Sequence, residues 1–211
     1  MSIAKQIREH IQNIPLGEPF HVSSLFELGA PANVRQVICR LQKAGDIAPV
    51  TRGIFVRPKE TPYLGAVMPG INEVVHVIEE TTGSPIVMHG AEAVRRLGLS
   101  TQMQMQPVFY TTGNNRCIRL GGFQIRLKHI SPRKIVRPGT VEGLVISALW
   151  YMKRQNVTLS TIAQIQKVLS PEDFEHVVSC ISLMPEWMGK VFYLYKRSQH
   201  DVAAKVRLYL S

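Results

Sequence analysis

The chain has 211 residues, of which 45% are hydrophobic and only 19% are charged, so it can bury a core and general disorder is excluded. Lys and Arg outnumber Asp and Glu by 25 to 15, and the net charge of +10 favours a polyanionic partner. Three widely spaced cysteines argue against a disulfide framework. No apolar run approaches the roughly 20 residues of a membrane span, and the first residues lack a signal-peptide core. We therefore expect a cytoplasmic protein that does not enter a membrane.

The first 60 residues predict two helices of ordinary length, a short helix between them and a two-stranded hairpin. Isoleucines recur every three to four positions near the N-terminus and give one apolar helix face behind a Ser2 N-cap. Gly29 and Pro31 separate the next two helices, and Gly53 permits the tight turn of the hairpin. In chain order we expect a helix at 2–13, a strand at 20–22, helices at 23–28 and 32–44, and strands at 47–50 and 54–57.

That order of elements is the layout of a winged helix-turn-helix, whose second helix enters the major groove of DNA. In the segment 32–44, the apolar residues fall on one arc and should pack inward. The opposite arc carries side-chain types that bond base edges and phosphates, and Arg52 stands at the tip of the hairpin. A plain solvated helix face is the alternative explanation. The candidate DNA-binding residues are Asn33, Arg35, Gln36, Arg40, Lys43 and Arg52.

The remainder of the chain predicts a second domain of mixed helices and strands. Prolines at 58 and 62 place a domain boundary near residue 60, between a winged-helix domain at 1–60 and a C-terminal α+β domain at 61–211. A helical tail follows residue 140, and Ser198 to Asp201 resemble a capping box for a last helix. The predicted elements are a helix at 71–82, a strand at 86–88, a helix at 91–97, an antiparallel meander of strands at 107–112, 116–120 and 123–130, and helices at 140–155, 160–169, 171–183 and 200–210.

Most of the excess positive charge lies outside the first domain, because residues 86–140 carry nine Lys or Arg and one Asp or Glu. Alternation in the predicted meander places its basic residues on one face and its apolar residues on the other. This basic face could contact DNA or RNA, or be only solvated. The possible second basic surface consists of Arg119, Arg126, Lys128, Arg133 and Lys134.

The run TRGIFVRPK at 51–59 resembles the wing of the AbiEi-type antitoxins, which belong to type IV toxin–antitoxin pairs. Three further stretches support the resemblance, which covers roughly residues 15–135. They are TPYLGAVMPG at 61–70, HGAEAVRRLGLSTQ at 89–102 and YTTGNNRCIRLGGFQIRLKHISPRK at 110–134.

The resemblance implies an N-terminal winged helix that binds operator DNA and represses its own operon, and a C-terminal domain that serves antitoxicity. It also implies a functional partner, a nucleotidyltransferase-like toxin, which such antitoxins oppose without forming a stable complex. A relative without a toxin would be a transcriptional regulator alone.

We do not expect an enzyme, a cofactor or a metal site. No phosphate-cradling glycine motif and no nucleophile elbow occurs. His176 and Cys180 have ligand-compatible spacing, but two ligands do not make a zinc site. The main alternative function is a winged helix that binds protein and not DNA. RNA binding through the basic sheet face ranks lower, because no exposed aromatic pair for base stacking is apparent.

Overall fold

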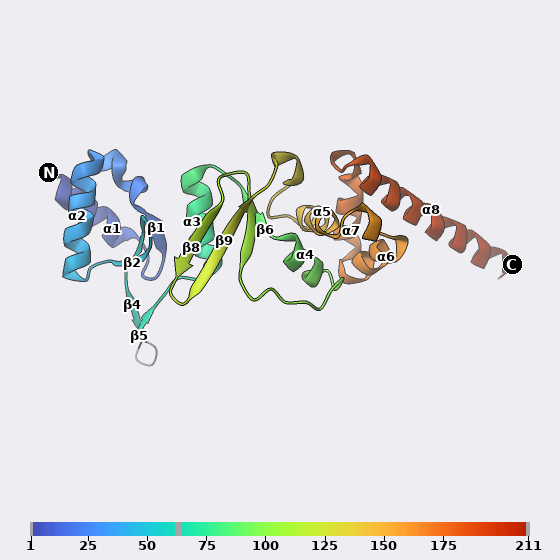
Figure 1. Ribbon diagram of the computed structural model, residues 1–211, viewed down its shortest axis with the longest axis horizontal. Coiled ribbons are helices and arrows are strands. Elements are labelled where there is room, and N and C mark those ends of the chain that lie inside the picture. Colours follow the sequence, from blue (N-terminus) through green and yellow to red (C-terminus); the bar gives the residue numbers. More distant parts are fainter. Residues whose placement is uncertain (1, 62–64, 210–211) are drawn as a thin grey trace. The chain divides into compact units, whose positions relative to one another are not determined.

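The computed structural model describes residues 2–61 and 65–209 and has a mixed α+β fold (Figure 1). The prediction of a mixed α+β protein is thereby confirmed, and the winged helix within it stays a prediction. The chain divides into two compact units, the first made of residues 1–86 and 115–127, the second of residues 87–114 and 128–211. We describe each unit by itself. The domain boundary expected near residue 60 falls inside the first unit, and the division into domains at 1–60 and 61–211 stays a prediction.

The first unit begins with helices and a small sheet. Its helices are α1 (Ile3–Asn13), the 3-10 helix η1 (Val22–Leu28) and α2 (Pro31–Ala44). The strands β1 (Pro19–His21), β2 (Ala48–Thr51) and β3 (Ile54–Val56) form an antiparallel sheet in the order β1-β3-β2. As predicted, Ser2 caps α1, and its hydroxyl accepts a hydrogen bond from the Lys5 N–H at 3.3 Å. The 23–28 segment is helical but has the tighter 3-10 geometry.

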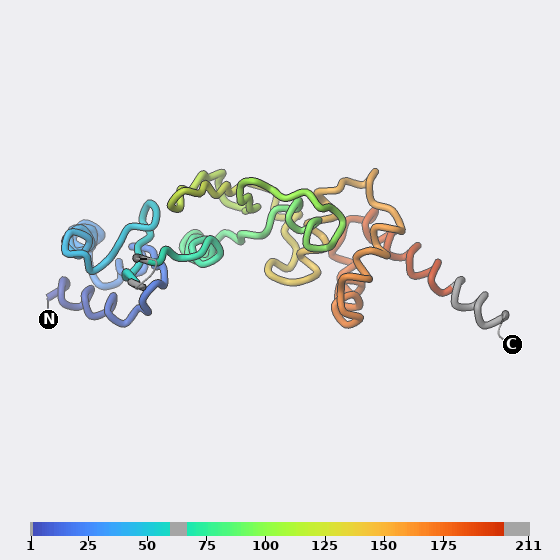
Figure 2. Tube along the Cα trace, turned by 90° about the horizontal axis from the view of Figure 1, so that it is seen from below, coloured from blue at the N-terminus to red at the C-terminus, as the bar shows by residue number. Residues whose placement is uncertain are grey.

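The core of these elements comes from the apolar arcs that the sequence predicts. In Figure 2, α1 lies in the plane of the view while α2 is seen end-on, so the two helices cross steeply. Both turn their apolar faces toward η1 and β1. Burying each such side chain contributes about 1.5–3 kcal/mol of stability. This burial holds α2 against α1, η1 and β1. The buried residues are Ile7, Ile11, Phe20, Leu25, Val34, Val37, Ile38, Leu41 and Ile47.

Three further pieces complete the first unit. The strands β4 (Lys59–Thr61) and β5 (Gly65–Val67) pair antiparallel, although the prolines around this segment predict no regular structure there. Helix α3 (Ile71–Thr82) has the predicted bounds, and Gly83 ends it with φ +62. Strand β8 (Arg116–Leu120) pairs antiparallel with β9 (Phe123–His129) in a hairpin.

The second unit is mostly helical and has its own core. Helix α4 approaches α5 closely at Gly90, where a Cβ would lie 2.3 Å from Tyr151 Cβ and 2.8 Å from the Ser147 carbonyl oxygen. The largest fully buried side chain is Phe192. The other elements of the chain are β6 (Ile86–Met88), α4 (Gly90–Arg96), β7 (Val108–Thr111), η2 (Pro132–Lys134), α5 (Val141–Met152), η3 (Arg154–Asn156), α6 (Leu159–Val168), α7 (Pro171–Ser179), η4 (Ile181–Leu183) and α8 (Glu186–Tyr209).

Two predictions about these elements are wrong. The strand order is β6-β7-β9-β8, so β9 lies between β7 and β8 and the three strands are not a meander. The final helix begins at Glu186 and not near His200. Ser198 does not cap a helix, because its hydroxyl donates to the Tyr195 carbonyl oxygen at 2.7 Å inside α8. No helix in the described part of the chain is both long and apolar enough to cross a membrane.

Candidate nucleic-acid interface

Helix α2 presents one polar arc to solvent. Pro31 occupies its first turn, where a missing N–H costs nothing. Gly45 ends it in the left-handed conformation, with φ +81. The helix contains no Asp or Glu, and no ion pair within residues 2–61 and 65–209 uses its three basic residues. The charges on the arc are therefore not neutralised by the protein. The exposed residues on the arc are Asn33, Arg35, Gln36, Cys39, Arg40, Gln42 and Lys43.

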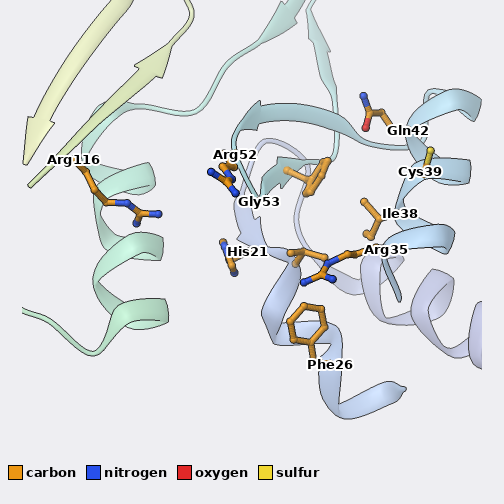
Figure 3. Close-up of a pocket in the computed structure, with 11 residues that line it drawn as sticks. His21, Phe26, Arg35, Ile38, Cys39, Gln42, Arg52, Gly53 and Arg116 are labelled. Atoms are coloured by element: carbon orange, nitrogen blue, oxygen red, sulfur yellow. The ribbon is translucent and has the colours of Figure 1, made fainter. Parts of the chain in front are cut away.

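The arc divides into two rows with different surroundings. Arg35, Cys39 and Gln42 line an open concavity of about 530 Å³ (Figure 3). The predicted residues of the other row, Asn33, Gln36, Arg40 and Lys43, are exposed but do not line it. Successive helical residues are about 100° apart, so the second row follows the first around the helix. The structure thus brings Arg35 together with Arg52, which also lines the concavity, and leaves the other four as a separate row.

The remaining walls of the concavity come from β1, η1, β3 and β8. Phe26 of η1 supports Arg35, whose guanidinium carbon lies 5.7 Å from the centre of the ring. His21 ends β1, and Arg116 begins β8. No Asp or Glu lines the concavity. Phe26, His21 and Arg116 were not predicted, since they belong to this surface only through the folding of the chain. Gln42 was also not predicted, although its spacing of seven residues from Arg35 places it on the same arc of α2.

The His21 ring is held in one orientation. Its Nδ1 accepts a hydrogen bond from the Ser23 N–H at 3.2 Å and lies 2.7 Å from the Ser23 hydroxyl. Because Nδ1 accepts from the backbone, the proton of the neutral ring lies on Nε2. Burial, and next the positive charge of Arg116, lower the pKa of His21 below its usual value. The imidazole is therefore neutral near pH 7.

Gly53 determines how closely the hairpin tip approaches His21. Its φ of +80 lies in the left-handed region, and a Cβ at this position would stand 2.7 Å from His21 Nε2. The Gly53 carbonyl oxygen accepts a hydrogen bond from the Val22 N–H at 2.8 Å. These contacts fix the exposed Arg52 at the rim of the concavity.

The β8–β9 hairpin has two faces of opposite character. Arg116 is paired with Leu127, and Ile118 with Ile125, so these four share one face. The predicted apolar face is thus confirmed, with the addition of Arg116 at its end. Arg119 and Arg126 lie on the other, exposed face.

The possible second basic surface is spread over both units. Arg119 and Arg126 belong to the first unit. Lys128, Arg133 and Lys134 belong to the second, and all five are exposed. Lys134 lies with its Nζ 5.0 Å from the centre of the Trp150 ring, which gives this cation a partner within its own unit.

The second unit buries a histidine between aromatic rings. The centre of the His89 ring is 4.5 Å from that of Tyr110 and 5.4 Å from that of Tyr151. Its Nδ1 accepts from the Ala91 N–H at 3.2 Å and lies 3.0 Å from the Gln104 amide nitrogen. Burial, and next the charge of Lys128, lower the pKa of His89. These contacts explain the histidine as a packed cap at the start of α4.

The histidine and cysteine at 176 and 180 do not converge. His176 is exposed, whereas Cys180 is buried and its sulfur accepts a hydrogen bond from Arg137 Nη1 at 3.2 Å. Within the described residues, no three His, Cys, Asp or Glu side chains lie close enough to hold one metal ion.

Comparison with known proteins gives a family but not an activity. A family model matches residues 6–177, and the chain belongs to this family, DUF6088, a family of unknown function. Searches of curated proteins and of solved structures found no match.

Proposed function

We propose that residues 1–60 form a winged helix-turn-helix domain that binds double-stranded DNA, and that the protein is a transcriptional repressor of its own operon. In this proposal α2 is the recognition helix, and the β2–β3 hairpin is the wing. The chain order η1, α2, β2, β3 and the sheet order β1-β3-β2 support it, since a winged helix needs the wing after its recognition helix.

The observation that carries the proposal is the polar arc of α2 together with the hairpin tip. The arc contains cations and amides without any carboxylate, and Arg35 and Arg52 line one concavity. Lys and Arg that lack acidic partners within the protein are the side chains that neutralise DNA phosphates, and amides and guanidinium groups read base edges. Asn33, Arg35, Gln36 and Arg40 would contact bases or phosphates, and Lys43 and Arg52 mainly phosphates.

The alternative of a protein-binding winged helix has less support. A protein-docking helix needs an exposed apolar patch. The large hydrophobic residues with exposed side chains in the described part of the chain all lie outside α2. The exposed face of α2 is therefore too polar to bury the apolar face of a partner helix.

The deciding experiment is a gel shift with the duplex that lies directly upstream of this protein's gene. The competitor is a shuffled duplex of equal length and composition, at about 0.15 M salt. We expect selective binding, with a preference of about 10³-fold or more, which Arg40→Ala abolishes. Arg154→Ala removes the same charge from an exposed site in the second unit and should bind as wild type. Equal affinity for both duplexes would refute sequence-specific binding.

We further propose an antitoxin role in the cytoplasm, on the strength of the resemblance over roughly residues 15–135. The functional partner would be a nucleotidyltransferase-like toxin encoded by an adjacent gene, opposed without a stable complex. If antitoxicity belongs to the second unit, Arg40→Ala should derepress the operon yet still protect cells that express the neighbouring gene. Growth and a promoter–reporter fusion measure the two effects separately, and loss of protection with Arg40→Ala would contradict this division.

A further inference from the structure

Three arginines from separate segments meet at the concavity of the first unit. Arg35 comes from α2, Arg52 from the hairpin tip and Arg116 from β8, and Figure 3 shows all three around the same space. Like charges repel, and no carboxylate lines the concavity to offset them. Guanidinium groups that converge without an acidic partner are typical of a phosphate site, because each offers paired donors to phosphate oxygens.

Arg116 has no place in the apolar packing of its own strand. In the β8–β9 register it lies on the face that carries Ile118, Ile125 and Leu127, which are buried, yet Arg116 is exposed. Its charge acts on the His21 imidazole, which also lines the concavity. Arg116 therefore belongs electrostatically to the concavity, although it lies about 60 residues beyond the hairpin tip in the chain.

The surroundings favour a phosphate that belongs to a long polyanion. The concavity shares Arg35 and Gln42 with the exposed arc of α2 and Arg52 with the hairpin tip, so a strand lying along the helix would pass over it. His21 adds a neutral donor, since its Nδ1 is occupied by Ser23 and its proton is on Nε2. The aromatic ring of Phe26 beneath Arg35 holds that guanidinium in place and gives the concavity an apolar wall.

We propose that this concavity binds a phosphate of the DNA backbone, and that Arg116 makes the β8–β9 hairpin part of the DNA interface. The inference rests on the proposed function and extends it. The DNA-binding surface would not end with the first 60 residues, because the hairpin supplies its third guanidinium. A protein truncated before residue 115 would then lack part of its affinity even if its N-terminal helices folded.

The test measures operator affinity as a function of salt for Arg116→Ala in the full-length chain. Each phosphate neutralised contributes about 0.9 to the slope of log K against log salt. Arg116→Ala should therefore flatten the slope by about 0.9, and its affinity deficit relative to wild type should shrink about 3.5-fold between 50 and 200 mM salt. Arg116→Lys keeps the charge and should restore the slope, although it loses the paired donors.

Two comparison variants make the result specific. Arg154→Ala in the second unit is the reference for loss of one positive charge and should keep the wild-type slope. Arg119→Ala removes a charge three residues from Arg116 and on the other face of β8. An equal loss of slope in Arg119→Ala and Arg116→Ala would overturn the concavity as the site, since the hairpin would then act only through its overall charge. Thermal unfolding checks that each variant is folded.

The remaining outcomes are distinct. If the wild type binds its operator but Arg116→Ala keeps the full slope, the inference fails and the proposed function stands. If the wild type shows no selective binding, the proposed function itself fails. Millimolar inorganic phosphate provides the last arm, monitored by the His21 ring signals in NMR. A response that Arg116→Ala removes, with an unchanged DNA slope, would assign the site to free phosphate and overturn the DNA assignment.

Discussion

Replacing Gly53 with alanine should destabilise the first unit more than replacing Gly45 with alanine. Both glycines have a left-handed backbone, with φ +80 and +81. A Cβ at Gly45 would meet nothing within 4 Å, whereas a Cβ at Gly53 would stand 2.7 Å from His21 Nε2. Gly45→Ala therefore measures the conformational cost alone, and Gly53→Ala measures this cost plus displacement of the imidazole.

The two costs can be worked out separately. Alanine in the left-handed region costs about 1–2 kcal/mol at either position. Moving the His21 ring also weakens its hydrogen bonds to Ser23, each of which contributes about 0.5–1.5 kcal/mol. We therefore expect Gly53→Ala to exceed Gly45→Ala by about 1 kcal/mol or more. That difference should fall near zero when both substitutions are made in a His21→Ala background.

The assay must report on the first unit. Both tryptophans, Trp150 and Trp187, lie in the second unit, so intrinsic fluorescence is unsuitable. Urea unfolding followed by far-UV circular dichroism, with amide hydrogen exchange in α2 and β3, measures the free energy of unfolding where it matters. Equal costs for the two variants, or an excess that survives in the His21→Ala background, would refute the proposed contact.

Three further outcomes are expected. The folded-state pKa of His21 and of His89 lies below the unfolded value of 6.5. The unfolded chain therefore binds more protons at acidic pH, so the free energy of unfolding should be highest above about pH 6.5 and should decrease below it. Urea midpoints at several pH values check this, and removing both histidines should reduce the dependence. Gln36→Ala should cost about 1–3 kcal/mol on the operator alone, whereas Lys43→Ala should weaken binding to any duplex and flatten the salt slope by about 0.9; equal losses on both duplexes would contradict the role of Gln36. Gly90→Ala should destabilise the second unit by about 1–3 kcal/mol, because a Cβ there would lie 2.3 Å from Tyr151 Cβ; tryptophan fluorescence measures this, and an unchanged midpoint would contradict the close approach of α4 to α5.

The sequence predicted correctly those helices whose buried face and end are determined by residues close together in the chain. Helix α3 has the expected bounds because its apolar period and the glycine that ends it lie in adjacent residues. The buried arc of α2 is confirmed for the same reason. These features require no knowledge of what the helix packs against.

Strand order and the composition of the concavity could not be read in this way. The sequence predicted the pairing of β8 with β9 correctly, because a two-glycine turn joins them. Backbone hydrogen bonds between strands carry no side-chain signature, so the position of β9 beside β7 was not apparent. Alternation correctly placed Arg119 outward, but it could not bring Arg116 to His21. That proximity arises only when β8 packs beside the first sheet of its unit.

Helix α8 was missed although a signal was present. Met188, Phe192 and Tyr195 recur every three to four residues and are buried in the core of the second unit. The helix that this period indicates continues through Ser198, whose capping-box neighbours suggested a new start. An apolar period that crosses a candidate cap is stronger evidence than the cap, since core burial contributes more free energy than one terminal hydrogen bond.

Arg57 gives the N-terminal elements a mechanical property. Its Nη1 donates to the Gln12 carbonyl oxygen at 2.7 Å and to the Ile14 carbonyl oxygen at 2.6 Å, so the residue that follows β3 is fastened to the end of α1. A pulling force applied to the chain after Arg57 would load these two bonds as well as the central strand β3, which is paired on both edges. The two Arg57 hydrogen bonds would therefore carry tension that otherwise reaches α2. In single-molecule stretching, Arg57→Ala should make α1, α2 and the β1-β3-β2 sheet unfold at a lower force.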